Sequence, residues 1–258
     1  ALYEYSATAA NGLQAWWPLK SIDDSLETED ASGNGHTGTA TSTSMGTPWM
    51  GSRGTSPLDH GIYSGLGQLS TVQFMGDTDD DGILIGTAAT WNGIIGTTGT
   101  KKMSLAFWIL RSGDTDKAQQ RLIQFGGDKY KSDNAIHASV NNNGQIIFYV
   151  DRDLAGGKWT SQASETTVTD NEWTHVVITY DGTAANPDPT IYINGSSVTL
   201  TENVTPVGGL NAISTDDCYL GRRLNDTGGT KFPFYGGMAQ ASVWDIVITS
   251  DDVAALYN

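Results

Sequence analysis

A two-residue alternation of apolar and polar side chains is the clearest pattern in the chain, and it is strongest at residues 176–180. A polar, proline-containing loop follows, and residues 190–194 predict a second strand. The pair Asn194-Gly195 tolerates the positive φ angles of a type I′ turn, so residues 197–200 are predicted to fold back as a hairpin partner. Two strand units separated by a polar loop and closed by a tight turn indicate an all-β fold.

Further strands are predicted from the same alternation or from short apolar runs. Apolar residues occupy both faces of the segment 103–111, which predicts burial on both sides or a covered concave face. Pro18 places the first strand near a sheet edge or a strand end. Thr249 and Asp252 form an approximate capping box for a short C-terminal helix. The predicted strands cover residues 13–20, 71–76, 103–111, 122–127, 135–140, 145–150, 218–221 and 237–248.

Two motifs connect this pattern to a known family. Residues 173–182 read W-T-H-V-V-I-T-Y-D-G, and residues 191–195 read I-Y-I-N-G. These two motifs resemble those of the laminin G-like branch of the concanavalin A-like lectin/glucanase superfamily. The resemblance implies a jelly-roll sandwich of two antiparallel sheets packed face to face, with a short C-terminal helix. It also implies recognition and adhesion rather than catalysis, although one sandwich can carry unrelated sites.

Length and composition fit one large all-β domain, because the 258 residues include 31 glycines and few charges. We interpret residues 13–258 as that domain and residues 1–12 as an N-terminal arm. Residues 44–69 do not match the core of the family, so we interpret them as a long loop or an inserted hairpin. No internal repeat, linker or second domain is evident in the sequence.

The formal net charge of −15 at pH 7 argues against binding to nucleic acid, which needs clustered Lys and Arg. It favours solubility and attracts divalent cations. The single cysteine, Cys218, excludes an internal disulfide and is predicted to be a buried thiol. No apolar run approaches the roughly 20 residues of a membrane span, so no membrane insertion is expected.

A calcium site is one candidate chemistry. The loop at residues 30–36 offers the oxygen-rich, glycine-bent composition that Ca²⁺ prefers. The resemblance implies a structural Ca²⁺ with Asp30 as its carboxylate ligand, Asn34 as an oxygen donor, and Gln240 where the family usually has Asp. That departure removes a negative charge. A turn held by Asp and Asn hydrogen bonds fits the same residues, so both interpretations stay open. For the four aspartates in residues 77–81, we favour a solvated acidic turn over a metal site.

Glycan recognition is the second candidate. Sugars are bound by aromatic platforms combined with planar polar groups, and lectin-like sandwiches place these on loops or on the concave sheet. Three tryptophans, Trp108, Trp173 and Trp244, are predicted to lie in the core. The candidate platforms lie in or beside Gly-rich loops; they are Trp49, Trp91, Tyr130, Trp159, Phe232 and Tyr235.

Catalysis is the least favoured candidate. Retaining glycosidases need two carboxylates about 5–5.5 Å apart, which on one strand means acids two or four residues apart. Glu27 with Glu29 and Asp151 with Asp153 have this spacing, but they fall in a loop and at a strand end. The hydrolase-like E-x-D-x-x-E pattern is absent, and no G-x-S-x-G context appears. We therefore expect a protein without enzyme activity.

The sequence supports two main functional hypotheses. The first is a surface module that binds glycans, displayed on a phage virion or bacterial exterior. The second is an assembly or decoration subunit of a capsid, fibre or filament, which would contact other chains through its N-terminal arm and the segment 44–69. A glycoside hydrolase remains a less favoured third. The placement outside the cell follows from family usage.

Overall fold

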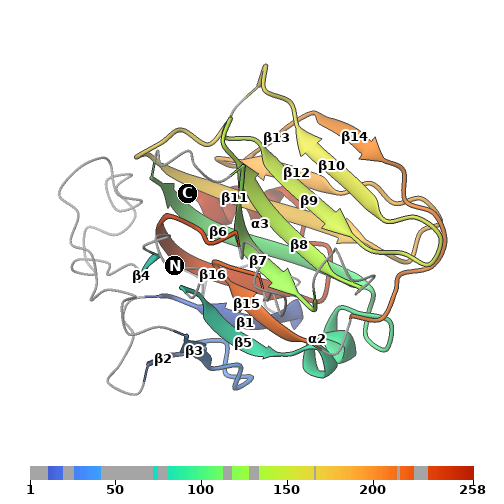
Figure 1. Cartoon of the computed structure of the whole chain (residues 1–258), viewed down its shortest axis with the longest axis horizontal. Coiled ribbons are helices and arrows are strands. Elements are labelled where there is room, and N and C mark those ends of the chain that lie inside the picture. The colour runs from blue at the N-terminus through green and yellow to red at the C-terminus, as the bar shows by residue number, and fades with distance from the viewer. Residues whose placement is uncertain are drawn as a thin grey trace.

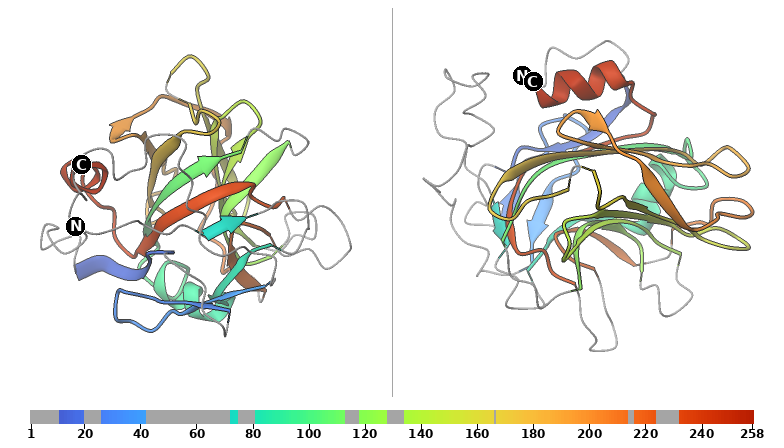
Figure 2. Two further views of the ribbon diagram at one scale, coloured as in Figure 1. Left: turned by 90° about the vertical axis from the view of Figure 1, so that its left-hand side faces the viewer. Right: turned by 90° about the horizontal axis from the view of Figure 1, so that it is seen from above.

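Two antiparallel sheets packed face to face make up the protein (Figure 1). The computed structural model describes residues 11–19, 26–41, 72–74, 81–112, 118–127, 134–165, 167–213, 216–223 and 232–258. Figure 2 shows the sheets as two layers, with the C-terminal helix on the outer side of one of them. The predicted sandwich of two antiparallel sheets is confirmed.

One sheet has seven strands among the described residues, and every pairing in it is antiparallel. Its first strand lies at an edge and ends just before Pro18, as predicted. In spatial order the strands are β1 (Leu13–Trp17), β16 (Gly236–Trp244), β6 (Lys102–Arg111), β11 (Trp173–Asp181), β12 (Thr190–Ile193) and β13 (Ser196–Ser197), with β4 (Val72–Phe74) paired to β16.

The other sheet has nine strands in the described part of the chain, again all antiparallel. In spatial order they are β14 (Leu200–Val204), β10 (Gly157–Ser161), β9 (Ile146–Val150), β8 (Ile136–Asn141), β7 (Gln119–Phe125), β15 (Asp217–Leu220), β5 (Ile83–Thr87), β3 (Gly38–Ala40) and β2 (Glu27–Thr28).

The core is the apolar layer between the sheets, and the alternation of side chains along each strand creates it. The rings of Phe148, Trp159 and Tyr180 meet there, with centroids 5.5–6.2 Å apart. Full burial of a large apolar side chain stabilises a fold by about 1.5–3 kcal/mol. The thiol of Cys218 lies in the same layer, and burial raises its pKa to about 12, so the predicted buried cysteine is confirmed.

Helix α3 (Ser250–Tyr257) seals the outer face of the seven-stranded sheet (Figure 2). Its predicted capping box is present: the Thr249 hydroxyl accepts a hydrogen bond from Asp252 N, and the Asp252 carboxylate accepts one from Thr249 N. Under the helix, the ring of Trp108 lies 4.9 Å from that of His175 and 5.8 Å from that of Tyr257. Strand β6 is therefore buried on both faces, as its sequence predicted.

The hairpin predicted after Asn194-Gly195 is present but shorter than expected. Both residues adopt positive φ angles, and Asn194 Oδ1 accepts a hydrogen bond from His175 N. The returning strand β13 contains only Ser196 and Ser197, because these exposed serines have no apolar face to bury against the sheet. The chain then crosses over, and Leu200 begins β14 in the other sheet.

Helix α2 (Ala88–Ile94) was not predicted from the sequence. Thr87 caps it by accepting a hydrogen bond from Thr90 N. Its residues include Thr and Gly, which are weak helix formers, so their composition does not favour a helix. Packing of Trp91 into the core stabilises it, since the Trp91 ring contacts Trp17 and Phe125.

The burial of His175 makes the stability of the protein depend on pH. Burial lowers the pKa of His175 to about 3, so the folded chain holds the imidazole neutral. The unfolded chain binds a proton near pH 6.5, so this stability is complete above pH 6.5 and declines as the pH falls toward about 3. We expect a loss of about 1.4 kcal/mol of unfolding free energy at pH 5.5 relative to neutral pH.

Urea unfolding between pH 7 and pH 5.5 measures this effect, because ordinary carboxylates stay ionised in that range. The variant His175→Phe keeps an aromatic ring beside Trp108 and removes the titrating group. Its stability should change less over this range than that of the wild type. Equal pH slopes for the two proteins would contradict the role of His175.

Candidate functional site

The outer face of the nine-stranded sheet carries a row of polar and aromatic side chains. On β8 and β9 the core-facing positions are apolar, and on β10 Trp159 faces the core; the intervening positions point the other way. The strand register places His137 opposite Tyr149, and Tyr149 opposite Lys158. In the next row, Arg121 on β7 lies opposite Ser139. Antiparallel pairing thus aligns side chains from four strands on one surface.

A cavity of about 220 Å³ opens among these side chains. Most of its lining comes from strands β7 to β10, and two residues come from the segments that flank the masked stretch between β15 and β16. The lining consists of Ala118, Gln119, Arg121, His137, Ile147, Tyr149, Lys158, Arg223 and Phe232. We call this set the sheet cavity.

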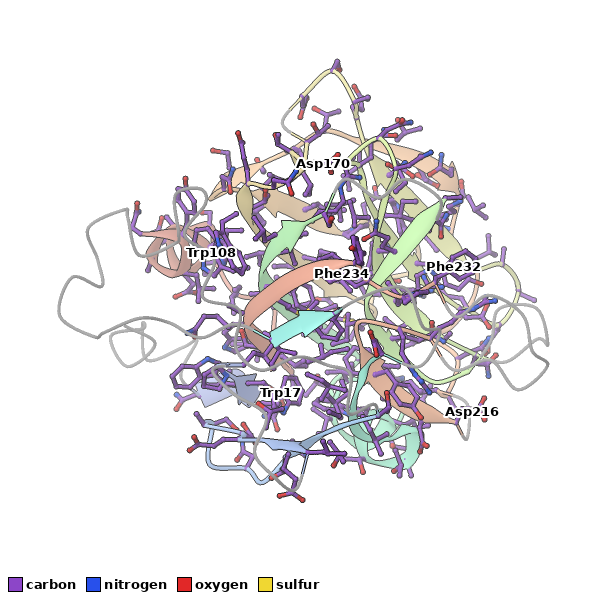
Figure 3. All side chains as sticks on the ribbon, turned by 60° about the vertical axis from the view of Figure 1, so that its left-hand side comes forward. Trp17, Trp108, Asp170, Asp216, Phe232 and Phe234 are labelled. Carbon is purple, nitrogen blue, oxygen red and sulfur yellow. The ribbon has the colours of Figure 1, made fainter. Side chains whose placement is uncertain are left out.

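Phe232 forms the aromatic side of the sheet cavity. The guanidinium carbon of Arg223 lies 4.4 Å from the centroid of its ring, and that of Arg121 lies 5.8 Å away. The carbonyl of Phe232 accepts a hydrogen bond from Arg121 N at 2.9 Å, which ties the segment to β7. Figure 3 shows Phe232 on the side of the nine-stranded sheet, away from Trp108 beside the C-terminal helix.

Tyr149 provides a second ring and a fixed hydroxyl. Its ring stacks on that of His137, with centroids 5.0 Å apart and planes at 22°. The hydroxyl donates to Asp151 Oδ1 at 3.3 Å. Burial, with the nearby Asp151 carboxylate, raises the pKa of Tyr149 to about 12, so the phenol stays protonated at every physiological pH.

The structure separates the predicted glycan-binding aromatics into three groups. Trp91 and Trp159 are 0% and 1% exposed, so the prediction of a sugar platform is wrong for both: their rings fill the core. Phe232 lines the sheet cavity, whereas Tyr235 is half-buried outside that lining. Trp49 and Tyr130 lie outside the described residues.

The two buried tryptophans have identifiable reasons for facing inward. Trp91 lies on helix α2 rather than in a loop, and its indole N–H donates to the Ile85 carbonyl at 3.0 Å. Trp159 lies at a core-facing position of β10, and its indole N–H donates to Asp188 at 2.8 Å. Each tryptophan thus buries its ring in the core while its indole N–H donates to a protein acceptor, as is usual for buried tryptophans.

Several residues of the sheet cavity were missed by the sequence analysis. The alternation along each strand could have predicted that His137, Tyr149 and Lys158 face outward, because each lies between two core-facing positions of its strand. No comparable signal existed for Arg121 and Arg223. They lie on separate segments, and only the fold brings both beside the ring of Phe232.

The loop proposed to bind calcium is held by hydrogen bonds to Asp30. Its Oδ1 accepts from the backbone N–H groups of Trp16 and Ser32, both at 2.9 Å. Its Oδ2 accepts from the Ser32 hydroxyl at 2.9 Å and from His36 N at 2.8 Å. Burial acts to raise the pKa of Asp30, but these hydrogen bonds outweigh it and hold the pKa below its usual value.

The other two proposed ligands also lie close to β1. Asn34 directs its amide N–H groups to the carbonyls of Leu13 and Gln14. Gln240 Oε1 accepts a hydrogen bond from the Trp16 indole at 2.8 Å. A carboxylate has about four lone-pair positions, and protein donors occupy that number on Asp30. This donor set does not fit Ca²⁺, and it matches the alternative interpretation of a hydrogen-bonded turn.

The remaining candidates from the sequence are the acidic segment 77–81, considered for metal binding, and the carboxylate pairs, considered for catalysis. Asp81 is buried, and the other three aspartates lie outside the described residues. Glu27 and Glu29 are exposed. The described lining of the sheet cavity contains no Asp or Glu. In the described ranges, no group of three or more His, Cys, Asp and Glu residues lies close enough to hold a metal ion.

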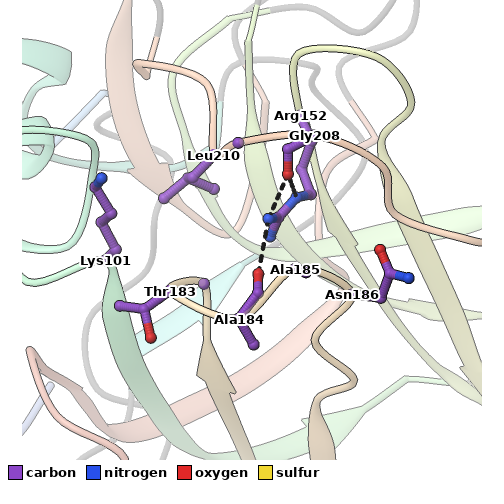
Figure 4. Close-up of a pocket in the computed structure, with 10 residues that line it drawn as sticks. Lys101, Arg152, Thr183, Ala184, Ala185, Asn186, Gly208 and Leu210 are labelled. Atoms are coloured by element: carbon purple, nitrogen blue, oxygen red, sulfur yellow. Dashed lines mark hydrogen bonds between the residues drawn. The ribbon is translucent and has the colours of Figure 1, made fainter.

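A larger cavity of about 490 Å³ lies at one end of the sandwich (Figure 4). Arg152 is the centre of this region, and its guanidinium donates to the carbonyls of Gly208 and Ala184 and to the Tyr180 hydroxyl. These bonds hold two loops together. Among the described residues, the rest of the lining is mostly glycine and alanine, without an aromatic ring. We therefore assign Arg152 a structural role.

A family comparison agrees with this architecture. The laminin G model of the concanavalin A-like lectin/glucanases superfamily matches residues 77–254. The chain belongs to this superfamily. Neither helix that the structure describes fully is long and apolar enough to cross a membrane. No curated protein matches the chain.

Solved structures of other proteins share the fold at low sequence identity. One is domain 4 of AbnA, an extracellular arabinanase from Geobacillus stearothermophilus, in complex with arabinotriose: identity is 16%, coverage is 96% of this chain and 98% of that chain, and the TM-score is 0.54. Another is the binding domain of botulinum neurotoxin serotype D/C, with 13% identity, 97% and 52% coverage and a TM-score of 0.60.

A third structure is that of botulinum neurotoxin type C in a study of its dependence on two ganglioside molecules for cell entry. It has 13% identity, covers 98% of this chain and 52% of that chain, and gives a TM-score of 0.59. The superfamily member described here thus spans about half the length of the toxin chains. At these identities the likenesses establish the fold alone.

The Asp30 loop gives a direct test of its structural role. The variant Asp30→Asn replaces an acceptor oxygen by an amide that faces N–H donors, so we expect it to lower the unfolding free energy by about 2 kcal/mol. Asp153→Asn is the control, because Asp153 is exposed and accepts one bond from Gly209 N at 3.2 Å. We expect this control to change stability by less than about 0.5 kcal/mol.

Urea denaturation of both variants should be run with added CaCl₂ and with a chelator. If hydrogen bonds alone hold the loop, the wild-type midpoint will be the same in both conditions. A wild-type midpoint that rises with Ca²⁺, together with loss of that rise in Asp30→Asn, would show that the loop binds the metal.

Proposed function

We propose that this protein is a non-enzymatic glycan-binding module that holds its ligand on the outer face of the nine-stranded sheet. The observation that carries the proposal is the sheet cavity, which combines the rings of Tyr149 and Phe232 with polar side chains from adjacent strands. Concave sites with aromatic walls and a few convergent polar groups are the usual form of a small-ligand site.

The chemistry of the cavity suits a sugar. A pyranose ring has an apolar face of C–H groups, which packs on aromatic rings, and an edge of hydroxyl groups, which needs hydrogen-bonding partners. The side chains of Gln119 and Lys158, which line the cavity together with Tyr149, can form hydrogen bonds with these hydroxyl groups. The volume of about 220 Å³ is below the roughly 300–1,000 Å³ of pockets for drug-sized ligands, so a short or terminal sugar is the matching size.

The fold comparisons support the same proposal. Domain 4 of AbnA was determined with arabinotriose, and the study of the type C toxin names ganglioside molecules. The described lining has no carboxylate, whereas glycosidases use a carboxylate pair, and this supports a binding role without catalysis. We place the module outside the cell, on a phage virion or bacterial exterior. The alternative of an assembly subunit depends on an N-terminal arm and a segment, 44–69, that lie almost entirely outside the described residues.

A glycan array with the purified protein tests the proposal. We expect binding to a defined class of glycans, and we expect Tyr149→Ala to reduce the affinity for a hit about tenfold or more, because loss of a central aromatic contact costs more than about 1 kcal/mol. The measurement is isothermal titration calorimetry with the strongest hit.

The control is Tyr192→Ala, which removes a tyrosine from the opposite sheet, beside the C-terminal helix. Circular dichroism of both variants at the titration temperature separates loss of binding from loss of fold. An array without any hit, obtained with folded protein, would count against glycan binding. Equal effects of the two variants would move the site away from the sheet cavity.

A further inference from the structure

We infer that the glycan is at least a disaccharide: its terminal sugar occupies the sheet cavity, and its second sugar lies on the outer face of strands β10 and β14. This inference rests on the proposed function and specifies the length and direction of the ligand. It comes from the strand register, which continues the row of the cavity to the edge of the sheet, and from two exposed side chains at that edge, Asn203 and Val204.

The row of outward-facing side chains extends beyond the lining of the sheet cavity. Tyr149 lies opposite Lys158, and Lys158 lies opposite Val204 on β14. Residues paired in this way point to the same face of a sheet, so Val204 shares the face of Tyr149. Adjacent strands are about 4.8 Å apart, so the two steps from β9 to β14 cover about 10 Å. Two linked sugar rings span a similar distance.

Asn203 is held on this face by a β-bulge and a hydrogen bond. The register between β10 and β14 shifts between Lys158 and Trp159, which leaves Asn203 as the additional residue of β14. A bulge of this kind commonly re-aims a side chain at a sheet edge. The Thr160 hydroxyl donates to Asn203 Oδ1 at 2.6 Å, and this bond sets the plane of the amide. The Nδ2 group of the exposed side chain is then positioned to donate to a sugar hydroxyl.

Val204 gives the same surface an apolar contact. Its side chain is 44% exposed. A single exposed valine is ordinary on a protein surface and would not by itself indicate a ligand. Beside an amide of fixed orientation, however, it completes the pair of contacts that a sugar ring needs: methyl groups for the face of C–H groups, and a planar donor for the hydroxyl edge.

The walls of the sheet cavity set the direction of the chain. Phe232 lines the cavity on the side of β7, where its carbonyl accepts from Arg121 N, whereas Lys158 is the last lining residue toward the edge strand β14 (Figure 1). A second sugar directed toward β7 would meet the Phe232 segment, but one directed toward β10 lies over exposed side chains. The sheet that the structure describes ends at β14, so a third sugar has no strand beneath it.

The test is a glycan array in which each terminal sugar is present at lengths of one, two and three residues. We expect the disaccharide of a hit to bind at least about fivefold more tightly than the monosaccharide, because its second sugar adds a hydrogen bond and an apolar contact. We expect the trisaccharide to bind within about twofold of the disaccharide, because the third sugar extends past the sheet edge.

Two variants with matched controls locate the second sugar. Asn203→Asp keeps the acceptor for Thr160 and removes the amide donors, and Asn143→Asp makes the same change in the exposed turn between β8 and β9. Val204→Ser removes the apolar contact, and Val247→Ser alters a valine of similar exposure, 39%, between β16 and α3.

Isothermal titration calorimetry with the strongest disaccharide hit and with its terminal monosaccharide measures the effects. We expect each variant on β14 to lower the affinity for the disaccharide about threefold or more and to leave that for the monosaccharide unchanged. We expect the two control variants to leave both affinities unchanged.

The outcomes separate this inference from the proposed function. Equal binding of monosaccharides and disaccharides would overturn the second position and leave glycan binding in place. A preference for disaccharides that survives in both Asn203→Asp and Val204→Ser would overturn the placement on β14. Equal losses for monosaccharide and disaccharide in these variants would also overturn it, because the effect would then lie in the sheet cavity. An array without any hit would overturn both proposals.

Discussion

Strand register among β7, β8, β9 and β10 is the constraint on which both the core and the sheet cavity depend. On β9, Phe148 packs in the core while its neighbour Tyr149 lines the sheet cavity. A slip by one residue would exchange these sets, because side chains alternate between the two faces of a strand. Burial of Phe148 and of similar residues, each worth about 1.5–3 kcal/mol, therefore also fixes which side chains line the sheet cavity.

The two sheets carry different side chains on their outer faces. Helix α3 packs on the seven-stranded sheet, and beneath it Trp108 and His175 form a closed aromatic layer. The outer face of that sheet is thus used for stability. Arg111 joins the two sheets, because its guanidinium donates to the Asn141 carbonyl on β8 and pairs with Asp170. The outer face of the nine-stranded sheet carries the polar and aromatic side chains that line the sheet cavity.

The loop beside β1 is held by hydrogen bonds at the position where the sequence offered a metal site. Asp30 lies where the superfamily resemblance implied a metal ligand, and four protein donors surround its carboxylate. Gln240, in place of an acidic residue, brings an amide oxygen that accepts from the Trp16 indole. These hydrogen bonds occupy the carboxylate oxygens that would otherwise face a cation.

The sequence by itself determined the all-β class, the buried strand β6, the capped helix α3 and the superfamily, because alternation, turn residues and caps act over a few neighbouring positions. It also contained, in the alternation of β8 and β9, the outward position of Tyr149. Only the tertiary structure placed Trp91 in the core and set Arg121 and Arg223 around Phe232. These placements depend on contacts between segments distant in the chain, and no local pattern encodes which distant partner a side chain meets.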